Sequence, residues 1–187
     1  MLFRKNIEQF IPDTTQEISD KRVILKYIDT FPNNILIREN EFAHITSSGF
    51  IMNENLDKVL MVHHNIYKTW AWTGGHADGD SDLLNVAIKE AIEETGVRDI
   101  KPLNNKIISL DILPVLGHIK KGKYVSSHLH LSIAYVLIAS EENKLIIKED
   151  ENSGVRWIAV EDIDKFSNEP YLIEIYKKII NRARAFR

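Results

Sequence analysis

The 187-residue chain carries 24 Lys and Arg residues against 27 Asp and Glu residues, a net charge of −3, and 44% of its residues are hydrophobic. This composition is typical of one globular domain with a substantial core, and its charge gives no reason to expect nucleic acid or an acidic membrane as a partner. The absence of cysteine excludes disulfides, thiolate nucleophiles and cysteine-ligated zinc. No apolar run approaches a membrane span and none near Met1 resembles a signal peptide, so we expect a cytoplasmic protein.

Residues 1 to about 40 are predicted to be helical. Pro12 favours a break, and a second helix is predicted to start after Asp13 or Thr14 and to end before Phe31-Pro32. This second helix carries apolar residues at helical spacing, namely Ile18, Val23, Ile24, Tyr27 and Ile28. We expect an N-terminal helical extension over residues 1–40 that packs on a core domain of residues 41–187, with a lid or a dimer arm as alternatives.

Strand patterns recur from Phe42 onward. The predicted strands cover residues 42–52, 58–64, 67–75, 107–119 with a bend at Pro114, 124–139 and 155–159, and a turn is expected at 120–123. Helices are predicted at residues 81–95, 161–166 and 169–184. Strands on both sides of one helix, followed by a last strand and closing helices, predict an α/β fold in which a mixed sheet lies between helical layers, an α/β/α sandwich.

The segment from Gly74 to Val97 is a loop rich in Gly and Asp that leads into one helix. Asp80 or Ser81 can cap the start of this helix, and Gly96 suits the position just past its end. Residues at helical spacing are expected to form an apolar face toward a sheet, namely Leu84, Ala87, Ile88, Ala91, Ile92 and Thr95.

Three glutamates of the same helix, Glu90, Glu93 and Glu94, are spaced three and four residues apart. At about 100° per residue they fall within an arc of roughly 100°, where like charges repel one another. A hard divalent cation bound through oxygens would convert this repulsion into coordination, whereas the simpler alternative is a solvated acidic face.

The segment resembles the Nudix box, the signature of the Nudix hydrolases. Gly75 fits the first glycine of that pattern, and Glu90-Ala91, Glu93-Glu94 and Gly96-Val97 fit its second half at the same spacing. Two positions differ: Ser81 stands where the family has an early Glu, and Lys89 stands where it has Arg. Lys89 keeps the charge but lacks the planar group that pairs bidentately with a carboxylate.

The resemblance implies a Nudix-type α/β/α sandwich and hydrolysis of a nucleoside diphosphate linked to another group X. It implies Mg²⁺ as cofactor, with Mn²⁺ as an alternative, and a small nucleotide-type substrate. Mg²⁺ suits this reaction because it binds carboxylates and phosphate oxygens together and keeps several waters. We expect no nucleic-acid or membrane partner, and either a monomer or a homodimer.

Glu90 and Glu94 lie one helical turn apart, and we expect both to be direct metal ligands. Glu93 is predicted as a further ligand or as the group that orients the attacking water, and the resemblance implies the carbonyl of Gly75 as another ligand. The general base is predicted to be a box glutamate or a glutamate on a distant loop, for which Glu151 is preferred over Glu149 and a solvated acidic loop is the alternative.

His76 and Lys89 of the box are predicted to contact the substrate. His128 and His130 alternate on a strand and therefore share a face, as a metal pair, a phosphate-contacting pair or ordinary half-buried residues. We predict substrate contact for both, whereas His44 and His118 carry no pattern that assigns a role. Further candidate phosphate contacts are Arg38, Arg156 and the lysines at 120, 121 and 123.

Two alternatives to a hydrolase remain. The isopentenyl-diphosphate isomerases share the Nudix fold but rely on a catalytic cysteine, which this chain lacks. A non-catalytic Nudix-like nucleotide-binding or regulatory domain is suggested by Ser81 and Lys89, and loss of Mg²⁺ binding would favour it.

Overall fold

The computed structural model describes residues 2–120 and 122–186 and is built around a mixed sheet of eight strands. The sheet order is β10-β2-β1-β9-β5, while β3 pairs with β2, β4 with β1 and β6 with β9. Its strands are β1 (Ala43–Met52), β2 (Lys58–His64), β3 (Trp70–Ala71), β4 (Thr73–His76), β5 (Ile100–Pro102), β6 (Ser109–Val115), β9 (His128–Ala139) and β10 (Asn152–Ala159). Strands β1 and β9 run parallel at the centre, and the other pairs are antiparallel.

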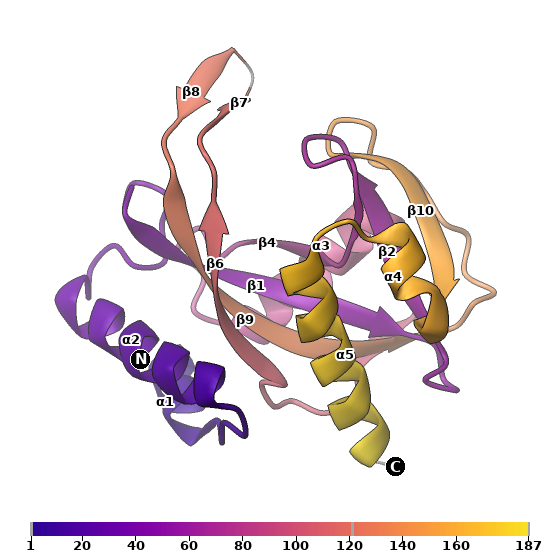
Figure 1. The fold of residues 1–187 in the computed structure, drawn as a ribbon, viewed down its shortest axis with the longest axis horizontal. Coiled ribbons are helices and arrows are strands. Elements are labelled where there is room, and N and C mark those ends of the chain that lie inside the picture. Colours follow the sequence, from indigo (N-terminus) through magenta and orange to yellow (C-terminus); the bar gives the residue numbers. More distant parts are fainter. Residues whose placement is uncertain (1, 121, 187) are drawn as a thin grey trace.

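Helices cover both faces of this sheet (Figure 1). The helices are α1 (Leu2–Gln9), α2 (Thr15–Thr30), α3 (Leu83–Thr95), α4 (Ile163–Phe166) and α5 (Pro170–Ala185), with a 3-10 turn at Val160–Asp162. On one face, Ala91 of α3 packs with Leu137 of β9; on the other, Tyr176 of α5 packs with Phe50 of β1. The chain is therefore an α/β/α sandwich around a mixed sheet, as the sequence predicts.

The register of β1 shows which residues lie on each face of the sheet. The hydroxyl of Ser47 donates a hydrogen bond of 2.5 Å to the carbonyl of Leu83, at the start of α3. Phe50 instead packs under α5. Because side chains alternate along a strand, the odd-numbered residues of β1 point toward α3 and the even-numbered ones toward the face that α5 covers. The pairing with β9 is continuous from Ala43 to Met52, so the two strands share this alternation.

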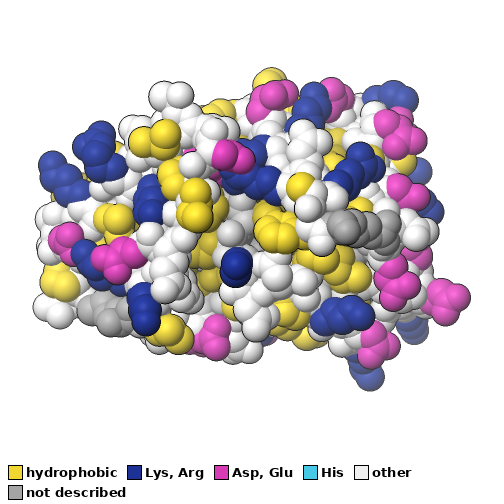
Figure 2. Space-filling model, turned by 90° about the horizontal axis from the view of Figure 1, so that it is seen from below, with side chains coloured by type: hydrophobic (Ala, Val, Ile, Leu, Met, Phe, Trp, Pro, Cys, Tyr) yellow, Lys and Arg dark blue, Asp and Glu magenta, His cyan; other side chains and the backbone are white. Residues whose placement is uncertain are grey.

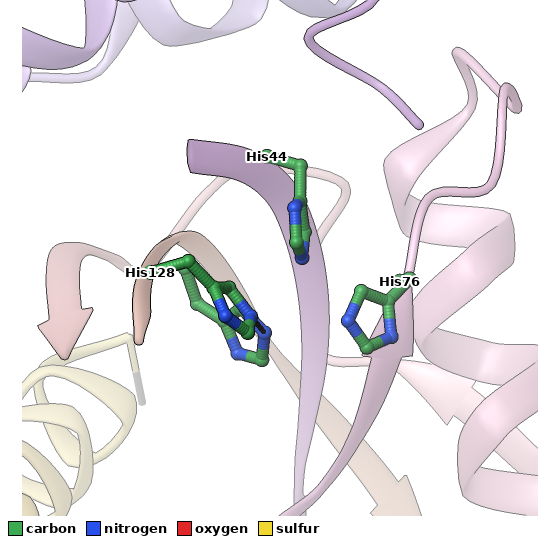
Figure 3. Close-up of side chains that lie close together, drawn as sticks. His44, His76 and His128 are labelled. Carbon is green, nitrogen blue, oxygen red and sulfur yellow. Dashed lines mark hydrogen bonds between the residues drawn. The ribbon is translucent and has the colours of Figure 1, made fainter. Parts of the chain in front are cut away.

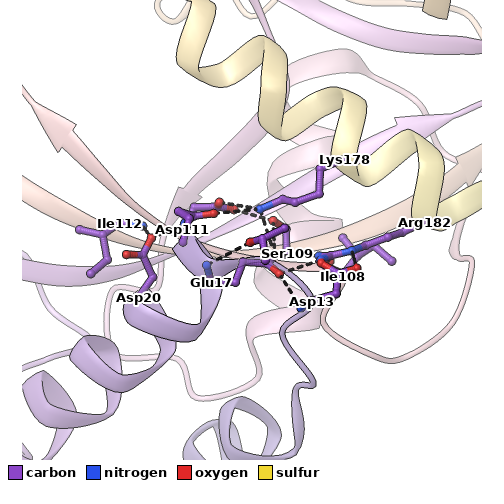
Figure 4. Close-up of polar contacts among 11 residues, drawn as sticks. Asp13, Glu17, Asp20, Ile108, Ser109, Asp111, Ile112, Lys178 and Arg182 are labelled. Atoms are coloured by element: carbon purple, nitrogen blue, oxygen red, sulfur yellow. Dashed lines mark hydrogen bonds and ion pairs between the residues drawn. The ribbon is translucent and has the colours of Figure 1, made fainter.

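The N-terminal helices pack on the α3 side and are tied to α5 across the edge strand β6. Phe3, Ile7 and Ile28 join the same apolar cluster as Leu131 of β9. Glu17 of α2 and Asp111 of β6 are both fully buried, and Lys178 of α5 contacts them at 3.0 and 2.8 Å (Figure 4). A second cation of α5, Arg182, contacts Glu17 at 2.6 Å and also pairs with Asp13. The division into an extension of residues 1–40 and a domain of residues 41–187 stays a prediction.

The structure corrects several details of the predicted elements, among them the predicted strand 67–75, which divides into β3 and β4. The segment 100–102 forms β5, which was not predicted, because a three-residue strand containing Pro102 has no strand pattern and depends on its pairing with β9. The predicted strands 107–119 and 124–139 each divide in two: beyond Gly117, which donates to Ser127, the chain forms the separate hairpin β7 (His118–Lys120) and β8 (Lys123–Val125). Of the lysines predicted in its turn, Lys121 lies outside the described residues.

The start and the apolar face of α3 also differ from the prediction. The residue that caps the helix is Asp82, not Asp80 or Ser81, because the Asp82 carboxylate accepts from the N–H of Asn85 at 3.1 Å. The buried face consists of Leu83, Val86, Ala87, Ala91, Glu94 and Thr95. Ile92, which was predicted to lie on the buried face, is exposed. Glu94, which was not predicted to lie on that face, is buried.

Among the described residues, no helix combines the length and the apolar character that crossing a membrane requires. The face shown in Figure 2 carries acidic and basic side chains interspersed among apolar ones. On that face the charges of both signs alternate and do not form one basic stripe, which agrees with the composition.

Candidate active site

The loop before α3 is held against β1 by backbone pairing. Gly74 and Gly75 belong to β4 and pair with Ser48 and Ser47 of β1. The helix that follows ends at Gly96, whose left-handed φ of 75° suits glycine because it lacks a Cβ. This strand-loop-helix unit fixes the position of the carboxylates on α3 relative to the glycine loop.

Three carboxylates meet at this unit. Glu90, Glu94 and Glu151 each offer one oxygen, and these oxygens all lie within 4.8 Å of one another. Glu90 and Glu94 come from successive turns of α3, whereas Glu151 comes from the loop before β10. Two of these residues are predicted metal ligands and the third is the predicted distant base, so the structure brings together residues about 60 positions apart in the sequence.

Contacts with the C-terminal end of α3 position the loop that carries Glu151. The N–H of Ile146 donates to the carbonyl of Thr95 at 2.8 Å, and the amide of Asn152 donates to the carbonyl of Glu94 at 3.0 Å. A Cβ on Gly96 would lie 2.6 Å from the side chain of Ile146, so this glycine also permits the loop to approach. The loop is therefore fastened on both sides of Glu151 rather than being a free connector.

Two glycines of the loop contact the glutamates: Gly75 lies next to the Glu90 carboxylate, and Gly74 donates a hydrogen bond to Glu94. A Cβ on Gly75 would lie 2.3 Å from the carboxyl carbon of Glu90, so a side chain at this position would displace the Glu90 carboxylate. The N–H of Gly74 donates to Glu94 at 2.8 Å. Only glycine at position 75 is compatible with so close an approach of the Glu90 carboxylate to the backbone.

The buried carboxylates carry more negative charge than their surroundings balance. Burial raises the pKa of Glu94 to about 8, an effect that the hydrogen bond from Gly74 offsets only in part and that the charge of Glu90 reinforces. Burial and the neighbouring Glu93 also raise the pKa of Glu90. Carboxylates that share a buried site in this way are stabilised by a cation, and three hard oxygen ligands fit a small divalent one such as Mg²⁺.

Glu93 lies apart from the three grouped carboxylates. Its oxygens contact Lys89 at 3.8 Å and Lys148 at 3.4 Å, and Lys148 also contacts Glu151 at 3.1 Å. Lys89 thus pairs with a glutamate of its own helix, although its side chain is largely exposed. Lys148 was missed in the sequence because it belongs to no motif; the only available signal was its position three residues before the preferred base, Glu151.

Arg38 is held by the glycine loop. Its guanidinium donates to both oxygens of Asp78 at 2.7 and 2.5 Å, a bidentate pair that raises the pKa of Arg38. The negative charges of Glu90 and Glu151 also act on this guanidinium. The pairing with Asp78 holds the positive charge of Arg38 in a fixed place, whereas the guanidinium of Arg156 lies 4.8 Å from the ring centroid of Phe166.

The predicted histidines gather at a neighbouring point of the sheet together with one that was not predicted. His76, His128 and His130 lie with His44 in one group in which one ring nitrogen from each residue lies within 4.8 Å of the others. Burial lowers the pKa of His44, and burial together with the neighbouring histidines lowers the pKa of His130 to about 2, so both are neutral. His44 was missed because a single histidine at the start of a strand has no distinguishing pattern.

Comparisons with known proteins identify the family and the fold of this chain. A family model described as the NUDIX domain matches residues 43–181. Among solved structures, a hydrolase of the NUDIX family from Clostridium perfringens is similar at 22% identity, with a TM-score of 0.54 over 77% of this chain and 98% of that one. An Ap4A hydrolase from C. elegans is similar at 15% identity, with a TM-score of 0.50 over 76% of this chain and 96% of that one. No curated protein matched the sequence.

Proposed function

The chain belongs to the NUDIX domain family, and we propose that it is a divalent-metal-dependent hydrolase that cleaves a phosphoanhydride bond in a nucleoside diphosphate linked to another group. The observation that carries this proposal is the grouping of Glu90, Glu94 and Glu151 beside Gly75. Grouped carboxylate oxygens are the hard ligands that a phosphate-bound dication needs, and a third carboxylate beside them can act on the attacking water.

In this proposal Glu90 and Glu94 hold the metal, and the carbonyl of Gly75 is a further ligand. When bound, Mg²⁺ or Mn²⁺ supplies positive charge that neutralises the phosphate oxygens and lowers the barrier to attack by water. Glu94 is kept in place by the N–H of Gly74 while its buried position limits competition from bulk water. The chain thereby fixes the position of this ligand before the substrate arrives.

Glu151 is the proposed general base. Its carboxylate accepts a proton as the water oxygen forms a bond to phosphorus, and the anhydride P–O bond breaks with its electron pair on the departing phosphate group. Glu93 is proposed to orient the water, and its contacts with Lys89 and Lys148 limit its rotation. Lys148 and Arg38 are proposed to contact the phosphates, since both carry a positive charge beside the carboxylates.

One of the remaining predicted contacts is part of the same proposal. Lys89 and His76 flank the glutamates along the chain, and His128 and His130 lie at the sheet end next to His76. Lys89 is proposed to contact the substrate beyond the scissile phosphates, whereas substrate contact by His76, His128 and His130 stays a prediction, because their rings lie on the sheet face opposite to the glutamates. A cytoplasmic location and a monomeric or homodimeric state stay predictions, as does the choice of a small nucleotide over RNA.

The test is the release of phosphate or nucleotide from a panel of nucleoside-diphosphate compounds with Mg²⁺, Mn²⁺ or EDTA. Wild type is compared with Glu93→Gln/Glu94→Gln and with a matched control, Glu161→Gln/Glu174→Gln, which changes two exposed glutamates distant in sequence from the site. Metal-dependent release that is lost only in the first double variant supports the proposal. No release from any compound, with metal binding also absent, would favour the non-catalytic alternative.

A further inference from the structure

Four histidines from three neighbouring strands lie on one face of the sheet. His44 of β1 is paired with His130 of β9, and Thr46 of β1 is paired with His76 of β4. Paired residues of adjacent strands share a face, as do residues two apart on one strand, so His128 joins the same group. Figure 3 shows the rings of His44, His76 and His128 turned toward one another.

This face is the one opposite to the glutamates. Ser47 and the paired Gly75 point toward α3, which carries Glu90 and Glu94. The histidines therefore point to the side of the sheet that α5 covers further along the strands. The sheet separates the group of glutamates from the group of histidines. Gly75, which lies beside the glutamates, and His76, which belongs to the histidine group, are consecutive residues of β4.

The distances within the histidine group fit one four-coordinate metal ion. All four residues contribute ring nitrogens within 4.8 Å of one another, and the Nε2 atoms of His128 and His130 are 3.3 Å apart. Two nitrogens that each lie about 2.0–2.1 Å from a tetrahedral ion are separated by roughly 3.3 Å. Small rotations of the rings would bring the four nitrogens to a common centre.

Hydrogen bonds already orient two of the rings as ligands. The Nδ1 atom of His44 lies 3.0 Å from the carbonyl oxygen of Asn40, and that of His128 lies 2.8 Å from the carbonyl oxygen of Ser126. A carbonyl only accepts, so each Nδ1 carries the hydrogen and each Nε2 presents a lone pair. Metal-binding histidines are oriented by such a hydrogen bond from the other ring nitrogen.

A buried nitrogen of His44 points to the same conclusion. His44 is 4% exposed, and its Nε2 atom has no hydrogen-bond partner within the described residues. A buried polar atom without a partner is costly unless a ligand meets it. An anion would need donors at this place, whereas His44 and His128 both present acceptors, so a cation that accepts nitrogen lone pairs fits better.

We propose that His44, His76, His128 and His130 form a second metal site, separate from the glutamates, for a transition-metal dication such as Zn²⁺. Imidazole nitrogens suit Zn²⁺, Co²⁺ and Ni²⁺, whereas Mg²⁺ prefers oxygen. An ion at this site joins β1, β4 and β9 next to Gly75. It fixes the end of the glycine loop and leaves the carboxylate site for the hard cation.

Visible absorption of Co²⁺ tests the site in the full chain with Mg²⁺ in excess. We expect the intense bands of a four-coordinate Co²⁺ ion at one equivalent, and their loss when Zn²⁺ is added. His128→Gln and His130→Gln should each weaken Co²⁺ binding by about 100-fold or more. The matched control His118→Gln changes a histidine outside the group, and Glu94→Gln removes a carboxylate; both should keep the bands.

Two results would overturn the proposal. One is the absence of a Co²⁺ or Zn²⁺ site in wild type when Mg²⁺ is present, and the other is binding that persists unchanged in both histidine variants. If a variant fails to fold by circular dichroism, the X-ray absorption spectrum of the zinc-loaded wild type decides. A ligand shell of imidazole nitrogens supports the proposal, and a shell of carboxylate oxygens contradicts it.

Discussion

Glu17 and Glu94 are two nearly buried glutamates, with 0% and 6% of their surface exposed, and yet their pKa values move in opposite directions. Burial alone would raise the pKa of Glu17, but hydrogen bonds from Arg182 and Lys178 outweigh it, so the pKa falls. Burial raises the pKa of Glu94 to about 8, because the hydrogen bond from the N–H of Gly74, which acts in the opposite direction, is too weak to cancel the effect of burial. The difference lies in the partners that the fold provides, not in the residue type or its burial.

The comparison separates a structural carboxylate from a functional one. Around Glu17 the chain supplies its own cations, which join α2, β6 and α5 into a closed network (Figure 4). Two more carboxylates, Glu90 and Glu151, lie beside Glu94, and one lysine, Lys148, contacts Glu151. A buried carboxylate beside two others is unfavourable for the free protein, and we take this cost as the sign of a site made for an external cation.

The largest expected effect is on activity. Glu94→Gln should lower turnover by about 10²- to 10⁴-fold, because loss of a hard ligand removes several kcal/mol of charge stabilisation in the transition state. Steady-state hydrolysis of the best substrate with Mg²⁺ measures this, beside Glu174→Gln as control. The fold should be retained by circular dichroism. Turnover near that of wild type would remove Glu94 from the site.

A similar change in the network should affect stability instead. Arg182→Ala leaves Glu17 and Asp13 short of a cation and should lower the free energy of unfolding by about 3 to 5 kcal/mol. Urea unfolding measures this loss. The control Lys177→Ala breaks only exposed ion pairs and should lower the free energy of unfolding far less. Equal losses in the two variants would mean that the network is not a special determinant of stability.

The pH dependence of stability should have opposite signs at the two glutamates. For Glu94 the pKa rises from 4.5 to about 8 on folding, so the stability that its protonated form contributes is complete below pH 4.5 and is lost as the pH rises through 8. Without metal, the stability of Glu94→Gln relative to wild type should therefore rise between pH 5 and pH 9, by roughly 4 kcal/mol. For Glu17 the lowered pKa means that stability is lost as the pH falls.

Urea unfolding across this pH range, in EDTA and then in Mg²⁺, measures both trends. Mg²⁺ should reduce the gain of Glu94→Gln, since the cation binds the ionised form of wild type. Glu17→Gln should be less stable than wild type near neutral pH, and this difference in the free energy of unfolding should shrink as the pH is lowered. Curves of wild type and Glu94→Gln that run parallel over the whole range would contradict the assigned pKa shift.

The smallest effect is expected at the position where the box departs from its family. Ser81 is exposed and does not cap α3, so Ser81→Glu should change the free energy of unfolding by no more than about 0.5 kcal/mol, with a slight gain from the helix dipole. Asp82→Ala removes the observed cap and should cost about 1 kcal/mol. A marked loss in Ser81→Glu would show that Ser81 supports the loop in another way.

The elements with strong periodicity or clear stop signals could be predicted from the sequence. Thr14 caps α2 and Gly96 ends α3 as predicted, because these signals act within a few residues. The strand β5 and the break at Gly117 depend on partners distant in the chain, which the local pattern does not contain. The box glutamates were found by their spacing, whereas Lys148 and His44 become part of a site only through the folding of separate strands and loops.

The most direct test of the comparison is a Mn²⁺ titration followed by the electron paramagnetic resonance of the free ion. Wild type, Glu90→Gln/Glu94→Gln and the control Glu161→Gln/Glu174→Gln are measured at pH 8, with folding checked by circular dichroism. The account predicts that wild type and the control bind Mn²⁺ and that the first double variant does not. Binding that is equal in all three proteins, or absent from wild type, would contradict the assignment of these buried carboxylates as a metal site.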